Sequence, residues 1–338
     1  MPKLNPNLFL DEDYEDYADR RRHRKKKHKP SHQSKSLAEQ VIAGVASEDS
    51  REIFEFSYRA SRHEREWILD SLGNFYDEHW LDDVLRLLKG GKEASVYLCA
   101  GNESVHASYI AAKVYRPRMF RHLRNDHQYR EGRTDLDASG NQITEDGMLH
   151  AMRKRSGYGL ELLHTSWIEH EYQALLALHA AGADVPLPFG RGNNAVLMGY
   201  IGDADVPAPI LNSIDLEPEE AHPLFERVVR NIEIMLSQQL VHGDLSAYNI
   251  LYWEGEITLI DFPQSVSPHE NRNAYRIFDR DVTRVCEYFA RQGVVVEPRR
   301  LAADLWTAYK YRLAPEVHPR LLDEQSEEDR AYWSRLQE

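Results

Sequence analysis

The chain has 338 residues, of which 42% are hydrophobic and 29% charged, a composition that is typical of a globular protein and excludes a disordered or collagen-like one. No apolar run is long enough to span a bilayer, and the opening MPKLNPNLFLDEDYEDY lacks the apolar core of a secretory signal. The two cysteines, Cys99 and Cys286, are too few for a disulfide framework or a four-thiolate zinc site. We therefore expect a cytoplasmic protein with no membrane partner.

Residues 1–35 are predicted to form a disordered tail with opposite charges in adjacent blocks. Residues 11–19 carry six acidic side chains, and residues 20–29, RRRHRKKKHK, carry eight Lys or Arg, although the net charge of the whole chain is −13. Three interpretations stay open: a solvated tail, an arm that binds the phosphates of RNA or of a ribosomal subunit, and mutual masking of the two blocks.

Residues 36–80 are predicted to form an N-terminal extension of two or three short helices. Apolar residues recur there at helical spacing, and Phe56 and Tyr58 lie near a second apolar stripe. From Val84 to Leu98 the pattern changes to strand, glycine turn and strand, and YIAAKVY at 109–115 predicts a third strand.

Residues 81–202 are expected to form a small lobe that contains a long polar insert at 116–163. We expect this insert to be a flexible loop, because connections of this length are usually functional or disordered. Residues 167–181 then predict an amphipathic helix that ends at Gly182. Residues 203–338 are predicted to form a second lobe and C-terminal helices.

The segment HGDLSAYN, residues 242–249, places Asp244 and Asn249 at the spacing of a kinase catalytic loop. In such a loop the aspartate accepts or orients the proton of the nucleophile, and the asparagine holds a metal. Asp261 follows the apolar run ITLI, where a carboxylate can hold Mg²⁺ against phosphates. The alternative is that these residues only cap turns. We expect His242 to brace the loop.

Lys113 lies among apolar residues in AAKVY, so its ammonium must either reach solvent or pair with an anion. In a kinase, such a lysine contacts phosphates of ATP and is held by a glutamate on the following helix. That helix offers Glu169 and Glu171, which point about 200° apart because each residue turns about 100°. We favour Glu171, with Glu169 as the second choice. The other interpretation is an exposed lysine on an edge strand.

The glycine turn in LKGGKEASVY allows backbone amides to approach phosphate closely, although an ordinary hairpin explains it equally well. The candidates for nucleotide binding in this turn are Gly90, Gly91, Lys92, Glu93, Ala94, Ser95 and Val96. After the helix, VLMGYIG predicts a strand and a connector, which fits either an adenine-binding hinge or an ordinary strand end. The candidates for contacts to adenine are Met198, Gly199, Tyr200 and Ile201.

Taken in chain order, these segments resemble the RIO family of atypical protein kinases. GGKEASVY is similar to the family's phosphate loop, AAKVY to its lysine strand, and WIEHEYQAL to its helix with the paired glutamate. VLMGYIG is similar to its hinge, HGDLSAYNILY to its catalytic loop and LIDFPQSV to its metal loop. The resemblance extends over residues 84–290, and its specificity comes from the order of the segments.

This resemblance implies an α+β, bilobal, protein-kinase-like fold with an antiparallel sheet and a helix in the small lobe and a mostly helical large lobe. It implies ATP and Mg²⁺, with Mn²⁺ as an alternative metal, in the cleft between them. It also implies that Asp244 is the catalytic base, that Asn249 and Asp261 are metal ligands, that Lys113 contacts ATP and that Asp261 is an aspartyl-phosphate site. The implied activity is that of a serine/threonine protein kinase, acting on protein substrates including itself, or of a switch ATPase linked to small ribosomal subunits.

Two features depart from ordinary protein kinases. The metal loop reads DFP rather than DFG, and no A-P-E follows before helical signal resumes near Tyr275, which leaves little room for a peptide-docking activation segment. An alternative is a small-molecule kinase of the aminoglycoside-phosphotransferase kind, which shares HGDL, a following Asn and IDF; GGKEASVY and FPQSV favour the RIO-like interpretation. A further alternative is a nucleotide-sensing module that binds RNA or ribosomes without catalysis.

Overall fold

The computed structural model describes residues 54–116, 129, 131–192 and 194–312, so the predictions for the charged tail lie outside the described residues. The helices of the described part are α2 (Arg62–Asp77), α4 (Asp146–Arg153), α5 (Gly157–Ala180), α6 (Pro218–Ser237), α7 (Ala274–Arg291) and α8 (Pro298–Ala308), with short 3-10 turns at Glu103–Val105, Leu211–Ser213 and Ala247–Asn249. The strands are β1 (Leu81–Gly90), β2 (Ala94–Gly101), β3 (Tyr109–Tyr115), β4 (Pro188–Arg191), β5 (Ala195–Gly199), β6 (Ile250–Trp253) and β7 (Glu256–Leu259). Within these residues, no helix combines the length and apolar character that crossing a membrane requires.

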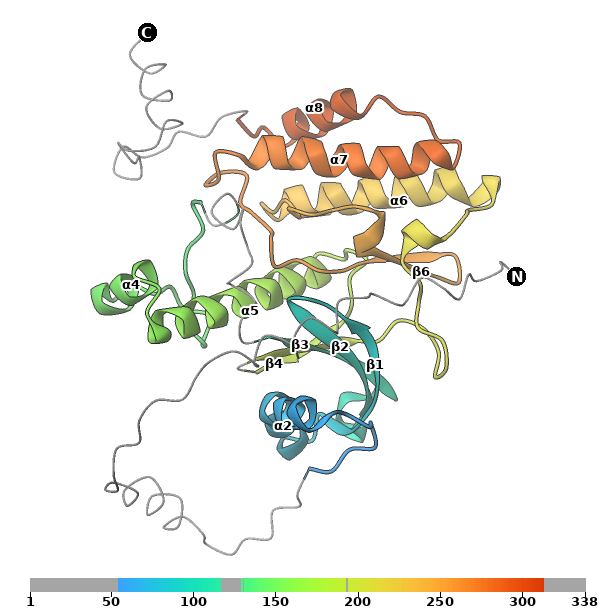
Figure 1. Ribbon diagram of the computed structural model, residues 1–338. Coiled ribbons are helices and arrows are strands. Elements are labelled where there is room, and N and C mark those ends of the chain that lie inside the picture. The colour runs from blue at the N-terminus through green and yellow to red at the C-terminus, as the bar shows by residue number, and fades with distance from the viewer. Residues whose placement is uncertain (1–53, 117–128, 130, 193, 313–338) are drawn as a thin grey trace, which may run out of the picture. The chain divides into compact units, whose positions relative to one another are not determined.

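Five strands form one antiparallel sheet in the order β1-β2-β3-β5-β4, and α5 runs between this sheet and the helices α6, α7 and α8 (Figure 1). Strand β3 is central, since Lys113 is paired with Val96 on β2 and with Val196 on β5. The interpretation of Lys113 as an edge-strand residue is therefore wrong. Because side chains alternate along a strand, Lys113 lies on the opposite face from the buried Val114.

Helix α2 covers one face of the sheet. It begins with a capping box, in which Glu64 N–H donates to the Ser61 hydroxyl and the Glu64 carboxylate accepts from the Ser61 backbone. Its apolar side, Ile68, Leu72 and Phe75, is fully or almost fully buried against the sheet. The helix thus fixes one side of the small lobe and leaves the other side to α5.

Residues 54–60 are the first described part of the extension that was predicted to be helical, and they form no helix. Phe54 and Phe56 are buried while Glu55 between them is exposed, and Tyr58 N–H donates to Val84 O over 2.9 Å. This alternation has the period of a strand rather than of a helix. The helical prediction is therefore wrong for Phe56 and Tyr58, and among the described residues of the extension it holds from Arg62 to Asp77.

The insert contains α4, and α5 begins at Gly157 rather than at residue 167. The expected loop is thus partly helical, with Ile143, Met152 and Leu163 buried beneath the sheet. Gly157 and Gly159 near the start of α5 lower the helix propensity of this segment, so the sequence did not predict helix there. Gly159 is nevertheless required, because a Cβ atom there would lie 1.9 Å from Ala151 O on α4.

The segment ahead of α4 also contacts the large lobe. Arg133 Nη1 donates to Pro263 O over 2.9 Å, and Asn273 Nδ2 donates to Glu131 Oε2 over 3.1 Å. Arg272 forms an ion pair with the same glutamate. These contacts connect the insert of the small lobe to the segment between β7 and α7.

The large lobe is built on α6, α7 and α8 with the two-stranded β6–β7 ribbon. Its core contains Phe225 on α6, Phe289 on α7 and Trp306 on α8, all buried. Helix α5 ends at Ala180, and Gly182 has a φ of 77°, as predicted for the residue that terminates it. Leu175 and Leu178 near this end join the same core, which places the other end of α5 beneath the sheet.

Candidate active site

Lys113 forms two ion pairs, and the one with Asp261 joins the two lobes. Its Nζ lies 2.5 Å from Glu171 Oε1 on α5 and 2.5 Å from Asp261 Oδ1 after β7. Tyr115, two residues along the same strand and hence on the same face, donates its hydroxyl to Glu171 Oε2. The lysine in AAKVY, the glutamate of the helix and the aspartate of LIDF, which are far apart in the sequence, thus meet at one point.

The structure separates the two glutamates of α5. Glu169 is 1% exposed and forms an ion pair with Arg191 on β4, and Gln173 Nε2 donates to Glu169 Oε1 over 2.8 Å. Glu171, and not Glu169, therefore faces Lys113. The half-turn offset between the two residues explains why they face different partners.

The ionisation of these three groups depends on burial and on one another. Burial opposes the charge of Lys113, but Asp261 and Glu171 raise its pKa above the ordinary value. Burial raises the pKa of Glu171 to about 7, against the opposing effect of the Lys113 ammonium. The surroundings of Asp261 likewise disfavour its charge, yet Lys113 holds the pKa of this carboxyl below the usual value. Lys113 and Asp261 are thus an ionised pair at neutral pH.

Asp261 has an unusual backbone. Its φ is 75°, in the left-handed region, where a non-glycine residue costs roughly 1–3 kcal/mol. The side chain is 44% exposed even though its Oδ1 contacts Lys113. This conformation turns the chain at the end of β7 and leaves part of the Asp261 side chain open to a ligand.

The catalytic-loop candidates lie directly beside this cluster. Ile260, the residue before Asp261, donates its backbone N–H to Asn249 O over 3.0 Å. This backbone hydrogen bond brings Asn249 close to Asp261 in the chain fold. Asn249 Nδ2 donates to Asp244 O over 2.8 Å and to Asp244 Oδ2 over 3.2 Å. Since the amide nitrogen is committed to Asp244, the Oδ1 of Asn249 is the atom suited to bind a metal.

His242 braces the same loop, as expected. Its Nε2 lies 3.1 Å from Ile260 O, and Asp244 N–H donates to its Nδ1 over 3.3 Å. Burial lowers the pKa of His242, and this bonding pattern assigns the neutral tautomer with the proton on Nε2. The imidazole therefore has both nitrogens engaged in holding the loop.

Three polar side chains of α7 also reach the catalytic loop, and the sequence analysis missed them. Asp281 Oδ2 accepts from Gly243 N–H over 2.9 Å, and Arg280 donates to Gly243 O. Arg284 Nη1 donates to Asp244 Oδ1 over 2.8 Å. Burial raises the pKa of Asp281 to about 6. An acidic residue within the apolar stripe of a helix was the signal available for Asp281.

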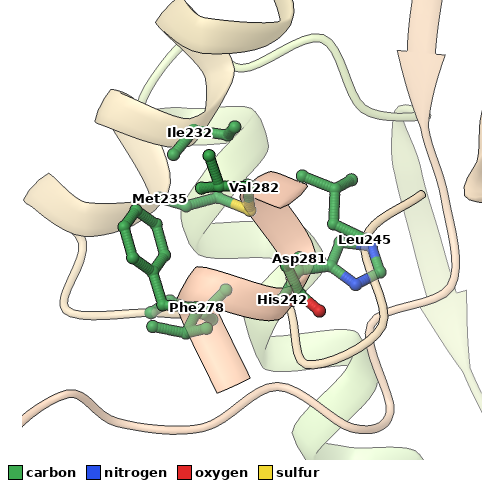
Figure 2. A pocket seen from close by; sticks show the side chains of 9 residues that line it. Ile232, Met235, His242, Leu245, Phe278, Asp281 and Val282 are labelled. Carbon is green, nitrogen blue, oxygen red and sulfur yellow. The ribbon is translucent and has the colours of Figure 1, made fainter. Parts of the chain in front are cut away.

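A small cavity of about 10 Å³ lies under the loop between α6 and α7, and Figure 2 shows Asp281 beside His242 and Leu245 in its wall. Apolar side chains, among them Met235 and Phe278, form most of the lining. A cavity of this volume holds at most about one water molecule. This cavity is a packing gap rather than a ligand site. A larger hollow of about 410 Å³ lies in the insert, lined by Asp135, Leu149, Met152, Arg153 and Arg155.

The glycine turn joins β1 and β2 as predicted. Gly91 requires the absence of a side chain, since a Cβ there would lie 2.9 Å from Ala94 O. In the predicted hinge, Gly199 N–H donates to Leu187 O over 2.7 Å, and Ile201 O accepts from Ala208 N–H over 3.0 Å. The backbone N–H of Gly199 is therefore already bonded within the protein.

The residues around Asp261 fit a magnesium ion. The Asp261 carboxylate and the Asn249 Oδ1 are the hard oxygen ligands that Mg²⁺ prefers. Among the described residues, no group of three or more His, Cys, Asp or Glu side chains could hold a metal without other ligands. A Mg²⁺ ion at Asp261 and Asn249 would therefore need further ligands, such as substrate phosphates.

In this site a lysine on a central strand pairs with a helix glutamate and with an aspartate beside an Asp-x4-Asn loop. This combination defines the class of two-lobed, protein-kinase-like folds. The model of the RIO domain matches residues 95–301. Because this match spans more than half of the chain, the chain belongs to the RIO family. The predicted family and the predicted α+β bilobal fold are thereby confirmed, and the aminoglycoside-phosphotransferase alternative is not favoured.

Curated relatives agree with this assignment. The human serine/threonine-protein kinase RIO1 is 33% identical over 132 residues, which cover 39% of this chain and 23% of that protein. The RIO-type serine/threonine-protein kinase Rio1 of Haloferax volcanii is 30% identical over 206 residues, which cover 60% of this chain and 62% of that protein. In both cases the chain covers less than two thirds of the relative.

A solved structure has the same fold. The Rio2 kinase–ADP/Mg²⁺–phosphoaspartate complex from Chaetomium thermophilum matches with a TM-score of 0.50 and 19% identity, covering 89% of this chain and 83% of that chain. At this level of identity the match supports the fold and leaves the chemistry to the residues of the site.

Proposed function

We propose that this chain is a RIO-type serine/threonine protein kinase or switch ATPase that transfers the γ-phosphoryl group of ATP. The observation that supports this most directly is the position of Lys113 Nζ, 2.5 Å from both Glu171 and Asp261. In a protein kinase such a lysine is held by a helix glutamate and contacts the phosphates of ATP. The kinase names of the relatives agree with this proposal.

Each residue of the site has a distinct role in this proposal. Glu171 holds Lys113 towards the phosphates, and Asn249 and Asp261 would bind the metal, Mg²⁺ or alternatively Mn²⁺. Mg²⁺ would neutralise charge that develops on the transferred phosphoryl group. Asp244 accepts the proton of the attacking hydroxyl.

The glycine turn and the hinge complete the proposed nucleotide site. Backbone amides of residues 90–96 would approach the phosphates, and residues 198–201 would contact adenine, with the Gly199 N–H excluded because Leu187 O already accepts from it. The protein itself is one candidate substrate.

A covalent variant of the reaction is open to Asp261, as in the Rio2 phosphoaspartate complex of C. thermophilum. In that variant a carboxylate oxygen bonds to the γ-phosphorus, the bond to the bridging oxygen breaks, and ADP leaves with the electron pair. No proton transfer is needed. Partial exposure of the Asp261 carboxylate, 44%, is compatible with such an attack.

The test is incubation of the full chain with γ-labelled ATP and Mg²⁺, alone and with ribosomal subunits. We expect label on the protein, and we expect the D244N variant to transfer label to hydroxyl groups roughly 10²–10⁴ times more slowly with ATP affinity retained. Hydroxylamine releases an acyl phosphate but not phosphoserine, so it separates the two products. Transfer by D244N at the wild-type rate would show that Asp244 is not the base.

We also propose a cytoplasmic location, in keeping with two buried free thiols, Cys99 and Cys286. Binding of RNA or of a ribosomal subunit through residues 20–29 stays a prediction. If it occurs, deletion of residues 1–35 should remove salt-sensitive RNA binding and leave ATP turnover unchanged.

A further inference from the structure

Arg284 on α7 contacts the carboxylate of Asp244, and the sequence motif of the catalytic loop does not account for this contact. Arg284 Nη1 donates to Asp244 Oδ1 over 2.8 Å, across a separation of 40 residues in the chain. The loop itself, HGDLSAYN, contains no Lys or Arg. A positive charge next to Asp244 therefore has to come from another element.

The packing of α7 determines where Arg284 lies. Ile277 and Val285 on this helix are buried in the core of the large lobe, and Asp281 accepts from Gly243 N–H in the catalytic loop. One turn after Asp281, the helix presents Arg284 to the residue that follows Gly243. The contact is thus a consequence of a helix that is fixed on both sides rather than of a chance surface encounter.

The other cations near the catalytic loop have different partners. Lys113 is paired with Glu171 and Asp261, and Arg280 donates to Gly243 O and to Asp281 Oδ1. Among the described residues, Arg284 is the basic side chain with a hydrogen bond to the Asp244 carboxylate.

The two oxygens of Asp244 are engaged unequally. Oδ1 accepts the charge-assisted hydrogen bond from Arg284 at 2.8 Å, whereas Oδ2 accepts a longer bond, 3.2 Å, from Asn249 Nδ2. A carboxylate held firmly at one oxygen has a defined orientation, and its second oxygen retains accepting capacity. Oδ2 is therefore the oxygen suited to receive a proton from a nucleophile.

The ion pair contributes little to folding. The side chains of Arg284 and Asp244 are 41% and 44% exposed, and pairs with this exposure add little to stability. An effect of Arg284 on turnover would therefore be separable from an effect on the fold.

We propose that Arg284 is a positioning residue for phosphoryl transfer, holding Asp244 Oδ1 so that Oδ2 faces the attacking hydroxyl. The inference rests on the proposed function. In the step it serves, the hydroxyl oxygen bonds to the γ-phosphorus and its proton passes to Asp244 Oδ2. The bond from the γ-phosphorus to the bridging oxygen breaks, and ADP leaves with that electron pair.

The experiment compares R284M, R284K and the control R291M in the full chain. Arg291 is also on α7, but it donates to Asn212 and lies over the Tyr288 ring, away from the catalytic loop. For each variant we would measure kcat for phosphoryl transfer, the Kd of ATP with Mg²⁺ and the temperature of unfolding. A misplaced base can slow a reaction about 10²-fold, which is the loss in kcat expected for R284M.

We expect R284M to keep the wild-type Kd and unfolding temperature, R284K to have an intermediate kcat because a single ammonium orients a carboxylate less well, and R291M to match the wild type. In R284A, free guanidinium ion at concentrations far below denaturing ones should restore part of kcat. A purely structural role would not produce that rescue.

Two results would overturn the inference. If R284M kept a kcat within about twofold of the wild type, or lost ATP affinity in proportion to its rate, Arg284 would not position the base. Absence of any transfer by the wild type would instead remove the proposed function and this inference together, so the two failures are distinguishable.

Discussion

Two ion pairs lie at the cleft, and they differ in burial. In the buried pair, the side chains of Lys113 and Glu171 are 12% and 4% exposed. In the open pair, the side chains of Asp244 and Arg284 are 44% and 41% exposed. The buried pair joins β3 to α5, whereas the open pair joins the catalytic loop to α7 within the large lobe.

Because of this difference in burial, substitutions in the two pairs should affect the free energy of unfolding and the turnover differently. Removing one partner of a buried ion pair leaves an uncompensated charge and costs roughly 3–5 kcal/mol, whereas an exposed pair contributes roughly 0–1 kcal/mol. The buried pair should therefore affect folding and nucleotide binding together. The open pair should affect turnover with little change in folding.

The largest effect is expected from Lys113→Met. The change leaves Glu171 and Asp261 facing each other without a cation, so we expect the free energy of unfolding to fall by roughly 3 kcal/mol and phosphoryl transfer to be lost. Urea denaturation and labelled-ATP transfer would measure both. The control is Lys154→Met at the exposed end of α4, for which we expect a change within about 0.5 kcal/mol. Equal stability of the two variants would contradict the importance of burial.

An intermediate effect is expected from a matched pair of substitutions on α5. Glu169→Gln leaves Arg191 without its charged partner, whereas Glu171→Gln removes one of the two carboxylates paired with Lys113. Glu169→Gln should lower the free energy of unfolding by roughly 2–3 kcal/mol. Glu171→Gln should lower it less, because Asp261 still pairs with Lys113 and burial favours the neutral form of Glu171. Only Glu171→Gln should also reduce kcat/KM for ATP, and steady-state kinetics would test this. A similar loss of kcat/KM in Glu169→Gln would mean that the two glutamates are not functionally distinct.

The last expected effect is a dependence of stability on pH. Burial raises the pKa of Glu171 from its ordinary value of 4.5 to about 7, so the folded protein binds more protons than the unfolded chain in this interval. The contribution of Glu171 to stability is therefore greatest at low pH and is lost as pH rises from 4.5 to 7. Urea denaturation at several pH values should show this decline in the wild type and a shallower one in Glu171→Gln. Parallel curves for the two proteins would remove Glu171 as the titrating group.

The sequence predicted the side chains that short motifs identify. Lys113, Asp244, Asn249 and Asp261 each lie in a segment with a recognisable pattern, and the strand at Tyr109–Tyr115 and the end of α5 at Gly182 followed from local signals. Glu171 was favoured over Glu169 by helical periodicity, and the contact with Lys113 agrees with that choice. Such features depend on residues close together in the chain.

Other features depend on tertiary packing and could not be predicted in this way. Arg284 reaches Asp244 because α7 docks on the catalytic loop 40 residues away, and no local pattern encodes that contact. The early start of α5 depends on the close approach of Gly159 to α4. The extended course of Phe54 and Phe56 is stabilised by burial against the sheet rather than by helical propensity.

The contacts between the insert and the large lobe have a kinetic consequence. Arg133 bonds to Pro263 O, and Glu131 bonds to Asn273, so the insert adds to the contacts that attach the small lobe to the large one besides the connector after β5. The insert and the connector together close a ring of contacts. Separation of the lobes must then break these bonds as well as bend the connector, which adds a barrier to the entry of one nucleotide and to the departure of the next.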